Sequence, residues 1–323
     1  MKPSQLLHAL SDLHATNIPA FIWGAAGIAK SAMVRAYAQS IGVPLIDYRL
    51  YLREAVDVMG LPGVVDGVTT YAKPAELPNN PDWRGIIFFD EWCIASHSQQ
   101  APGMQLFLDR MCGGFKLPVG AYLVAASNRQ SDRGLFHRLL DPQADRVCHL
   151  DLEADLTDWL DWAARSGEVG PEVPAFLRFR PNLLHSYDPQ RKWHAQTTPR
   201  GWADVAKIIP RRSMVEADLI RGRVGDAAAG EFIAFLKLAR EMVSPDEILK
   251  NPKTAEVPTN NAVLYALAEA LARRATLGNW GAVTTYAKRM PKEYAQCMVS
   301  SAKAILPALC NTREYIDWAS KNG

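Results

Sequence analysis

The chain has 323 residues, a length that predicts two domains or three small ones. Hydrophobic residues make up 48% of the chain and charged residues 22%, which is typical of a globular protein and excludes wholesale disorder and collagen-like sequence. No apolar run approaches the ~18 residues of a membrane span, and the first residues lack the pattern of a signal peptide.

The formal net charge of +2 conceals an asymmetry between the halves of the chain. Residues 1–161 carry 13 Lys and Arg against 18 Asp and Glu, whereas residues 162–323 carry 23 against 16. The densest basic stretch, 178–212, holds eight Lys and Arg opposed by Asp188 and Asp204. This stretch is compatible with an acidic partner, either nucleic acid or an acidic protein surface, and equally with a solvated face that keeps the protein soluble.

The cysteines are five in number and lie far apart, with no Cys-x-x-Cys pair. An odd number of scattered cysteines predicts reduced, mostly buried thiols and a cytoplasmic location. They are Cys93, Cys112, Cys148, Cys297 and Cys310.

The first 155 residues alternate between helical and strand patterns. Helices are predicted at 4–16, 31–40 and 99–111, and strands at 18–23, 44–50, 85–91, 121–127 and 147–152. Asp66-Gly67 lies between two β-branched runs, which predicts a hairpin within 58–71. Apolar strands separated by helices indicate a parallel sheet covered on both faces.

The pattern becomes all-helical at about residue 153. Helices are predicted at 155–165, 171–180, 199–209 and 216–242, and about three more within 260–323. We therefore expect an α/β core at 1–154, a helical domain at 155–245 and a C-terminal helical extension at 246–323.

A glycine-rich segment lies between the first predicted strand and the following helix. It reads Gly24-Ala25-Ala26-Gly27-Ile28-Ala29-Lys30-Ser31, and Ala32 continues it into the helix. Such a loop turns its N–H groups around a phosphate chain, while the lysine reaches the outer phosphates and the serine hydroxyl holds Mg²⁺. Ala29 replaces the usual last glycine. The alternative is a strand-to-helix turn without a ligand, which the offset of Lys30-Ser31 from Gly24 argues against.

Two further strands end in polar residues. Ile86–Phe89 is followed by Asp90 and Glu91, and the strand 121–127 is followed by Asn128. Open α/β sheets bind ligands at this carboxyl edge, where the first acid would join Ser31 as a Mg²⁺ ligand and the second would polarise the attacking water. Asn128 would hold the same water, so its strand should lie beside the phosphate loop. Taken singly, these residues could equally be a solvated strand end and a turn residue.

With GAAGIAKS, IIFFDE and AASN in this order, the chain resembles an AAA+ ATPase of the MoxR-like branch. That branch often has GIAKS in its phosphate loop, and the hairpin around Asp66-Gly67 resembles one of its insertions. The resemblance extends well to about residue 210. It implies a P-loop AAA+ core with a parallel sheet flanked by helices, followed by a helical lid, and it implies bound ATP.

The resemblance also implies roles for two arginines. Arg146, just before the last strand, resembles the finger that reaches a neighbouring subunit's ATP, and Arg133 and Arg138 compete for that role. Arg200, at the start of a lid helix, resembles the second sensor of the γ-phosphate. For each arginine singly, a surface salt bridge is the ordinary alternative.

The function implied is ATP hydrolysis by a ring, a hexamer in this family, that remodels a protein client, with a von Willebrand A domain protein as the partner. The alternative function is an AAA+ nucleic-acid motor or loader that uses the basic stretch 178–212, although no helix-turn-helix or zinc-finger motif supports it.

Overall fold

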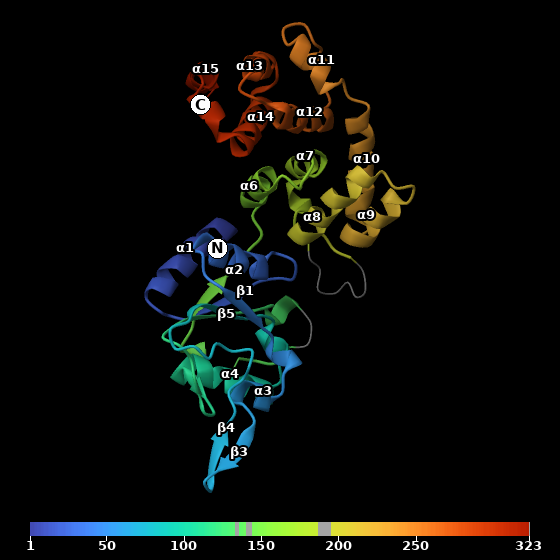
Figure 1. The fold of residues 1–323 in the computed structure, drawn as a ribbon. Helices are drawn as coiled ribbons and strands as arrows, with labels where there is room; N and C mark the ends of the chain where they lie inside the picture. Colours follow the sequence, from blue (N-terminus) through green and yellow to red (C-terminus); the bar gives the residue numbers. More distant parts are fainter. Residues whose placement is uncertain (133–135, 140–143, 187–194, 323) are drawn as a thin grey trace. The chain divides into compact units, whose positions relative to one another are not determined.

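The computed structural model describes residues 1–132, 136–139, 144–186 and 195–322. The chain divides into two compact units, Met1–Glu153 and Ala154–Gly323. The first is the α/β unit and the second is all-helical (Figure 1).

A five-stranded parallel sheet forms the centre of the α/β unit, in the order β2-β5-β8-β1-β9. The strands are β1 (Ala20–Trp23), β2 (Leu45–Tyr48), β5 (Arg84–Phe89), β8 (Gly120–Ser127) and β9 (Cys148–Asp151). All five strands predicted from the apolar runs are therefore present. β8 lies between β5 and β1, which confirms that the strand before Asn128 is next to the strand that enters the glycine-rich loop.

Both faces of the sheet are covered by helices, as the continuous apolar strands predict (Figure 1). On one face, His14 of α1 (Pro3–Ala15) stacks on Tyr122 of β8, with 4.5 Å between ring centroids, and α1 also packs on α2 (Lys30–Ser40). On the other face, Phe107 of α4 (His97–Asp109) packs against Phe89. The short helix α3 (Ala55–Met59) packs on α4.

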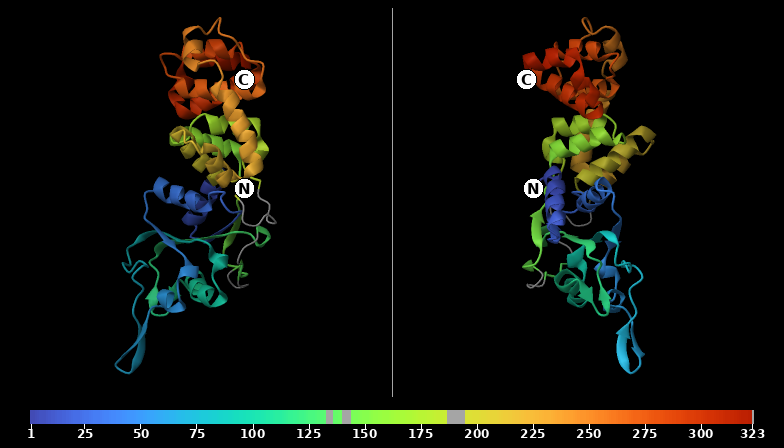
Figure 2. Two further views of the ribbon diagram at one scale, coloured as in Figure 1. Left: turned by 90° about the vertical axis from the view of Figure 1, so that its right-hand side faces the viewer. Right: turned by 60° about the vertical axis from the view of Figure 1, so that its left-hand side comes forward.

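Two small hairpins belong to the same unit. The first pairs β3 (Pro62–Val65) with β4 (Val68–Tyr71) and extends away from the sheet (Figure 2). Its turn residues have positive φ, 52° at Asp66 and 76° at Gly67, so the predicted Asp-Gly hairpin is confirmed. The second, β6 (Met111–Cys112) with β7 (Phe115–Lys116), was not expected.

Ten α-helices are described in the second unit. They are α6 (Leu156–Ser166), α7 (Glu172–Phe179), α8 (Pro199–Ile208), α9 (Glu216–Val224), α10 (Asp226–Arg240), α11 (Pro245–Lys250), α12 (Asn261–Arg274), α13 (Trp280–Ala287), α14 (Lys292–Ile305) and α15 (Arg313–Asn322). The expectation of one helix over 216–242 is wrong, because Gly225, with φ 84° and ψ 161°, separates α9 from α10. The described part of 260–323, which ends at residue 322, forms four α-helices rather than about three. Within the described residues of this unit the only β pairing is an isolated bridge between Ser186 and Thr197.

One hydrophobic cluster runs through the helical unit from Trp159 to Trp318. A buried polar group also joins three of its helices: Nε of Arg178 (α7) donates to Oε1 of Glu269 (α12) at 2.7 Å, and Nη2 donates to Ser301 (α14) at 3.0 Å. The Ser301 hydroxyl in turn donates to the same Glu269 oxygen at 2.6 Å. The expected domain division at residue 245 stays a prediction, and the segments on its two sides share this core.

The expected fold class is thus confirmed. The chain has an α/β core with a parallel sheet flanked by helices, and an all-helical extension after it. None of the described helices is both long and apolar enough to cross a membrane.

Candidate functional site

The glycine-rich loop leads directly from β1 into α2. Gly24 donates its N–H to the carbonyl of Ser127 at 3.3 Å, which ties the loop to the end of β8. A Cβ atom on Gly24 would lie 2.9 Å from the carbonyl oxygen of Leu152, so this close approach requires glycine. Gly27 and Ala29 then take φ values of 77° and 80°. The loop is therefore sharply turned, and its backbone ends at the N-terminus of an eleven-residue helix.

Ala29 stands at a left-handed position that glycine adopts without strain. We expect Ala29→Gly to raise the free energy of unfolding by about 1 kcal/mol, the αL penalty less the extra chain entropy of glycine. Chemical denaturation measures the change. The matched control is Ala36→Gly at an exposed position inside α2, which should lower stability by about 1 kcal/mol. A destabilised Ala29→Gly protein would contradict the prediction.

Lys30 brings the loop and β8 together. Its ammonium group donates to the carbonyls of Gly24 at 2.7 Å and Ala25 at 3.1 Å, and to Oδ1 of Asn128 at 2.7 Å. The lysine is only 6% exposed, so its charge lies inside the loop rather than in bulk water. The amide that sequence analysis places near the phosphate loop is thus in direct contact with the loop lysine.

Ser31 connects the loop to β5. Its hydroxyl donates to Oδ2 of Asp90 at 2.6 Å, and Asp90 is 4% exposed. A hydroxyl and a carboxylate oxygen side by side are hard ligands of the kind that Mg²⁺ takes together with phosphate oxygens. Among the described residues no three His, Cys, Asp or Glu side chains cluster as a metal site. The expected metal ligands are therefore adjacent.

Glu91 follows Asp90 at a left-handed turn with φ 55°. Its N–H donates to Oδ1 of Asp90 at 3.0 Å, so one carboxylate of the pair accepts from both Ser31 and the Glu91 backbone. The turn starts a short 3-10 helix, Trp92–Ile94, that leads the chain away from the sheet. Glu91 is thereby held at the carboxyl edge of β5, where the sequence predicts it.

Ser127 is a contributor that sequence analysis missed. It is buried, its hydroxyl accepts the N–H of Cys93 at 3.2 Å, and its carbonyl accepts the N–H of Gly24. It therefore links the turn after Glu91 to the glycine-rich loop. The only signal in the sequence is its place directly before Asn128.

The three candidate arginines that the structure describes lie on the surface. Arg146 is exposed in the turn before β9 and forms no ion pair with any residue that the structure describes, while Asp141, a candidate partner for a salt bridge, lies outside the described residues. Arg138 is also exposed, whereas Arg133 lies outside the described residues. Arg200 belongs to the helical unit, where it is exposed in the first turn of α8 after Thr198, whose hydroxyl accepts the N–H of Gly201 at 3.0 Å.

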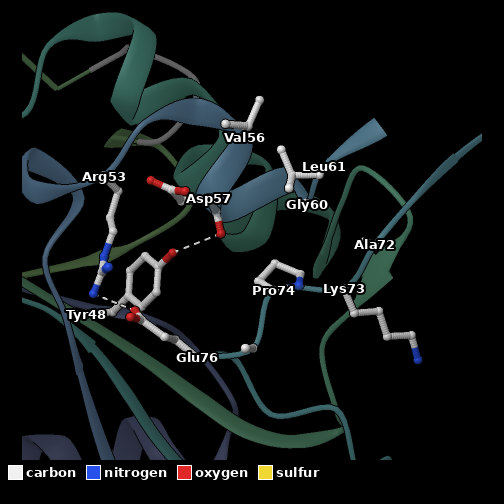
Figure 3. A pocket seen from close by; sticks show the side chains of 11 residues that line it. Tyr48, Arg53, Val56, Asp57, Gly60, Leu61, Ala72, Lys73, Pro74 and Glu76 are labelled. Carbon is white, nitrogen blue, oxygen red and sulfur yellow. Dashed lines mark hydrogen bonds and ion pairs between the residues drawn. The ribbon is translucent and has the colours of Figure 1, made fainter. Parts of the chain in front are cut away.

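A separate pocket of about 240 Å³ lies at the base of the β3–β4 hairpin (Figure 3). Arg53 pairs with Glu76 at 2.5 Å inside it, and the Tyr48 hydroxyl donates to the carbonyl of Asp57 at 3.3 Å. Burial raises the pKa of Tyr48 to about 12, although the Arg53 guanidinium opposes the shift. The residues of the glycine-rich loop are not part of this lining. Nothing in the sequence pattern predicts the pocket.

The cysteines are unpaired in the structure. Cys93 and Cys112 are buried, and burial raises the pKa of each thiol to about 11, so both are protonated at neutral pH. Cys148, Cys297 and Cys310 are partly exposed, which corrects the expectation of mostly buried thiols.

No protein-family model and no curated protein matches the chain. Solved structures that align with it include NtrX from Brucella abortus, at 15% identity over 94% of this chain and 67% of that one, with a TM-score of 0.40. A point mutant of RuvB from Thermotoga maritima aligns at 16% identity over 83% and 80%, with a TM-score of 0.44. A putative ATPase from Cytophaga hutchinsonii aligns at 14% identity over 94% and 81%, with a TM-score of 0.38. Alignments at this level assign no function by themselves.

Proposed function

We propose that the chain is an AAA+ ATPase that binds MgATP at the carboxyl edge of its sheet and hydrolyses it. The observation that carries the proposal is the convergence of Lys30, Ser31, Asp90 and Asn128, which follow three adjacent strands and touch one another in two hydrogen-bonded pairs. Each of these residue types serves phosphoryl transfer at this position of a P-loop fold. A merely structural turn would not require a buried lysine and a buried aspartate at the same edge of the sheet.

The residues divide the chemistry among them. Lys30 would move its ammonium group onto the outer phosphates, while the turned loop backbone and the α2 N-terminus receive their negative charge. Mg²⁺, held by Ser31 and Asp90, would supply charge neutralisation of the β- and γ-phosphates. Glu91 would polarise the attacking water, and Asn128 would orient that water from the adjacent strand.

The finer proposal is a MoxR-like remodelling ATPase. The GIAKS sequence of the loop and the β3–β4 hairpin before β5 support this branch. It would act in the cytoplasm as a homo-oligomeric ring, a hexamer, in which Arg146 of one subunit serves the ATP of the next and Arg200 senses the γ-phosphate within its own subunit. Its client would be a protein, with a von Willebrand A domain protein as partner.

The alternative is a nucleic-acid motor, which the basic stretch 178–212 would favour. Several of its charges are engaged within the protein: Arg178 with Glu269, Arg180 with Glu231 and Lys207 with Glu168. ATPase rates with and without DNA at two salt concentrations separate the two functions. Strong stimulation that falls steeply with salt would support the motor and contradict the protein-remodelling proposal.

Glu91→Gln is expected to retain ATP and to lower kcat by about 10²–10⁴-fold, because the amide keeps the shape of the side chain but cannot polarise water. Equilibrium binding of a labelled ATP analogue and steady-state hydrolysis measure the two effects separately. Asp109→Asn, at an exposed position in α4, is the matched control and should leave both unchanged. Hydrolysis by Glu91→Gln within a few fold of wild type would show that another residue positions the water.

The same variant tests the client. An ATP-trapped ring should retain client proteins in a pull-down more strongly than wild type does. A von Willebrand A domain protein retained only with ATP would support the proposed partner, and retention independent of nucleotide would contradict it.

A further inference from the structure

The last residue before the phosphate loop is hydrogen-bonded to the edge strand of the sheet. Nε1 of Trp23, at the end of β1, lies 2.8 Å from Nδ1 of His149 in β9. The two rings are stacked, with centroids 6.1 Å apart and an interplanar angle of 18°. Phe21 also stacks on Trp23, with 4.4 Å between centroids. The tryptophan is thus held in a group of three rings.

The hydrogen-bond chemistry of this pair assigns the tautomer of His149. An indole N–H is only a donor, so Nδ1 must be the acceptor, and in the neutral ring the proton then resides on Nε2. Nε2 lies 2.9 Å from the carbonyl oxygen of Ala144, to which it donates. The imidazole therefore accepts one hydrogen bond, from Trp23, and donates another, to Ala144, and so links two segments of the chain.

Ala144 lies two residues before Arg146, directly before the turn that leads into β9. Within the part of the chain that the structure describes, the hydrogen bond from His149 to the Ala144 carbonyl ties this segment to β9. The parallel pairing of β1 with β9, which sets Phe21 opposite His149, positions the imidazole beside both the loop strand and the turn. His149 is exposed, so burial in a core does not explain its position.

We propose that His149 is a positioning residue for Arg146. The Nε2–H of His149 donates to the Ala144 carbonyl. This hydrogen bond fixes the turn that carries Arg146 relative to β1, the strand that ends at the phosphate loop. A subunit thereby presents its arginine to the neighbouring subunit in a geometry that depends on Trp23, the residue that precedes its own loop. The inference rests on the proposed ATPase function with Arg146 acting in trans.

Substitutions separate the effect of the two hydrogen bonds of His149 from the effect of the volume of its ring. His149→Phe keeps a ring but removes both hydrogen bonds, and is expected to lower kcat about 10–100-fold with an unchanged KM for ATP, since a misplacement of ~1 Å costs about 10²-fold. His149→Gln retains an amide donor for Ala144 and should recover most of that loss. Trp23→Phe keeps the stacking but removes the indole donor, and should lower kcat several-fold. His8→Phe, at an exposed position in α1, is the control and should match wild type.

Mixed rings show whether His149 acts on the ATP site of the neighbouring subunit or on that of its own subunit. When His149→Phe subunits are mixed with Lys30→Ala subunits, the latter present an intact turn to the functional loop of their neighbours, so hydrolysis per His149→Phe subunit should rise. When His149→Phe is mixed with Arg146→Ala, no arginine turn is restored and no rise is expected. A rise in the first mixture alone supports the inference. No rise in rings shown to be mixed would assign the defect to the subunit's own loop and overturn the inference.

The outcomes also distinguish this inference from the proposed function. If wild type hydrolyses ATP in a Lys30-dependent manner but His149→Phe leaves kcat within twofold, the positioning role is wrong and the ATPase assignment stands. If wild type itself neither binds nor hydrolyses ATP, the proposed function is wrong. Thermal unfolding of each variant accompanies the kinetics, and a His149→Gln protein that folds like wild type yet is as slow as His149→Phe would also contradict the role assigned to the Nε2–H.

Discussion

Lys30→Ala is expected to abolish ATP binding and to reduce hydrolysis to background. The ammonium group is the one cation that the loop buries, and three oxygen atoms already surround it. An alanine leaves the phosphate charge opposed by backbone dipoles alone, and no other side chain from 24 to 32 carries a positive charge. Titration with a fluorescent ATP analogue measures the affinity directly.

The control for this experiment is Lys116→Ala, which removes an exposed lysine from β7 and should bind ATP normally. Because Lys30 also bridges to Asn128, the unfolding transition of the variant must be recorded alongside. A folded Lys30→Ala protein that binds the ATP analogue with wild-type affinity would contradict the phosphate-loop assignment.

Arg146→Ala is expected to lower kcat by about 10³–10⁵-fold, the range of arginine fingers in related chemistry, while ATP still binds. The loss should be repaired across a subunit boundary. In rings that combine Arg146→Ala with Lys30→Ala, some interfaces have an intact loop on one side and an intact arginine on the other, so part of the hydrolysis should return.

Absence of any recovery in rings shown to be mixed would assign Arg146 a role within its own subunit or a structural one. Arg138→Ala, at the other exposed arginine of the segment, serves as the comparison in the same mixture. A larger loss for Arg138→Ala than for Arg146→Ala would move the finger role to Arg138.

The strand core was predictable because burial on two faces leaves an unmistakable sequence pattern. IIFF before Asp90 and AYLVAA before Ser127 are apolar at every position, and both form central strands. The hairpin at Asp66-Gly67 was predictable for a different reason, since two consecutive residues with positive φ strongly favour Asp-Gly.

Helix ends were harder to predict. Apolar residues recur at helical spacing through 216–242, and a glycine inside such a pattern is often tolerated. Gly225 instead takes a conformation with φ 84° that ends α9, where an added Cβ would lie 2.6 Å from the carbonyl of Ala195. That contact is made by a residue distant in sequence, so no local pattern reveals it. The β6–β7 hairpin was missed because two-residue strands carry no periodicity.

The residues of the site were predictable where parallel topology forces them together. Lys30, Asp90 and Asn128 follow three strands, and the carboxyl ends of neighbouring parallel strands meet at one edge. The Trp23–His149–Ala144 bridge was not predictable, because it depends on the side-chain rotamers of two aromatic residues 126 positions apart. Single residues of common types without a motif leave no signal until the register of β1 with β9 is known.

The buried contact among Arg178, Glu269 and Ser301 has a consequence for shortened versions of the protein. A chain cut at residue 245 loses the carboxylate and the hydroxyl but keeps the guanidinium, and a buried charge left without its partner costs about 3–5 kcal/mol. The C-terminal helices therefore cannot be removed without destabilising α7. A force applied to the C-terminal helices reaches α7 through these three side chains, so the last 78 residues are mechanically coupled to a helix that precedes residue 245.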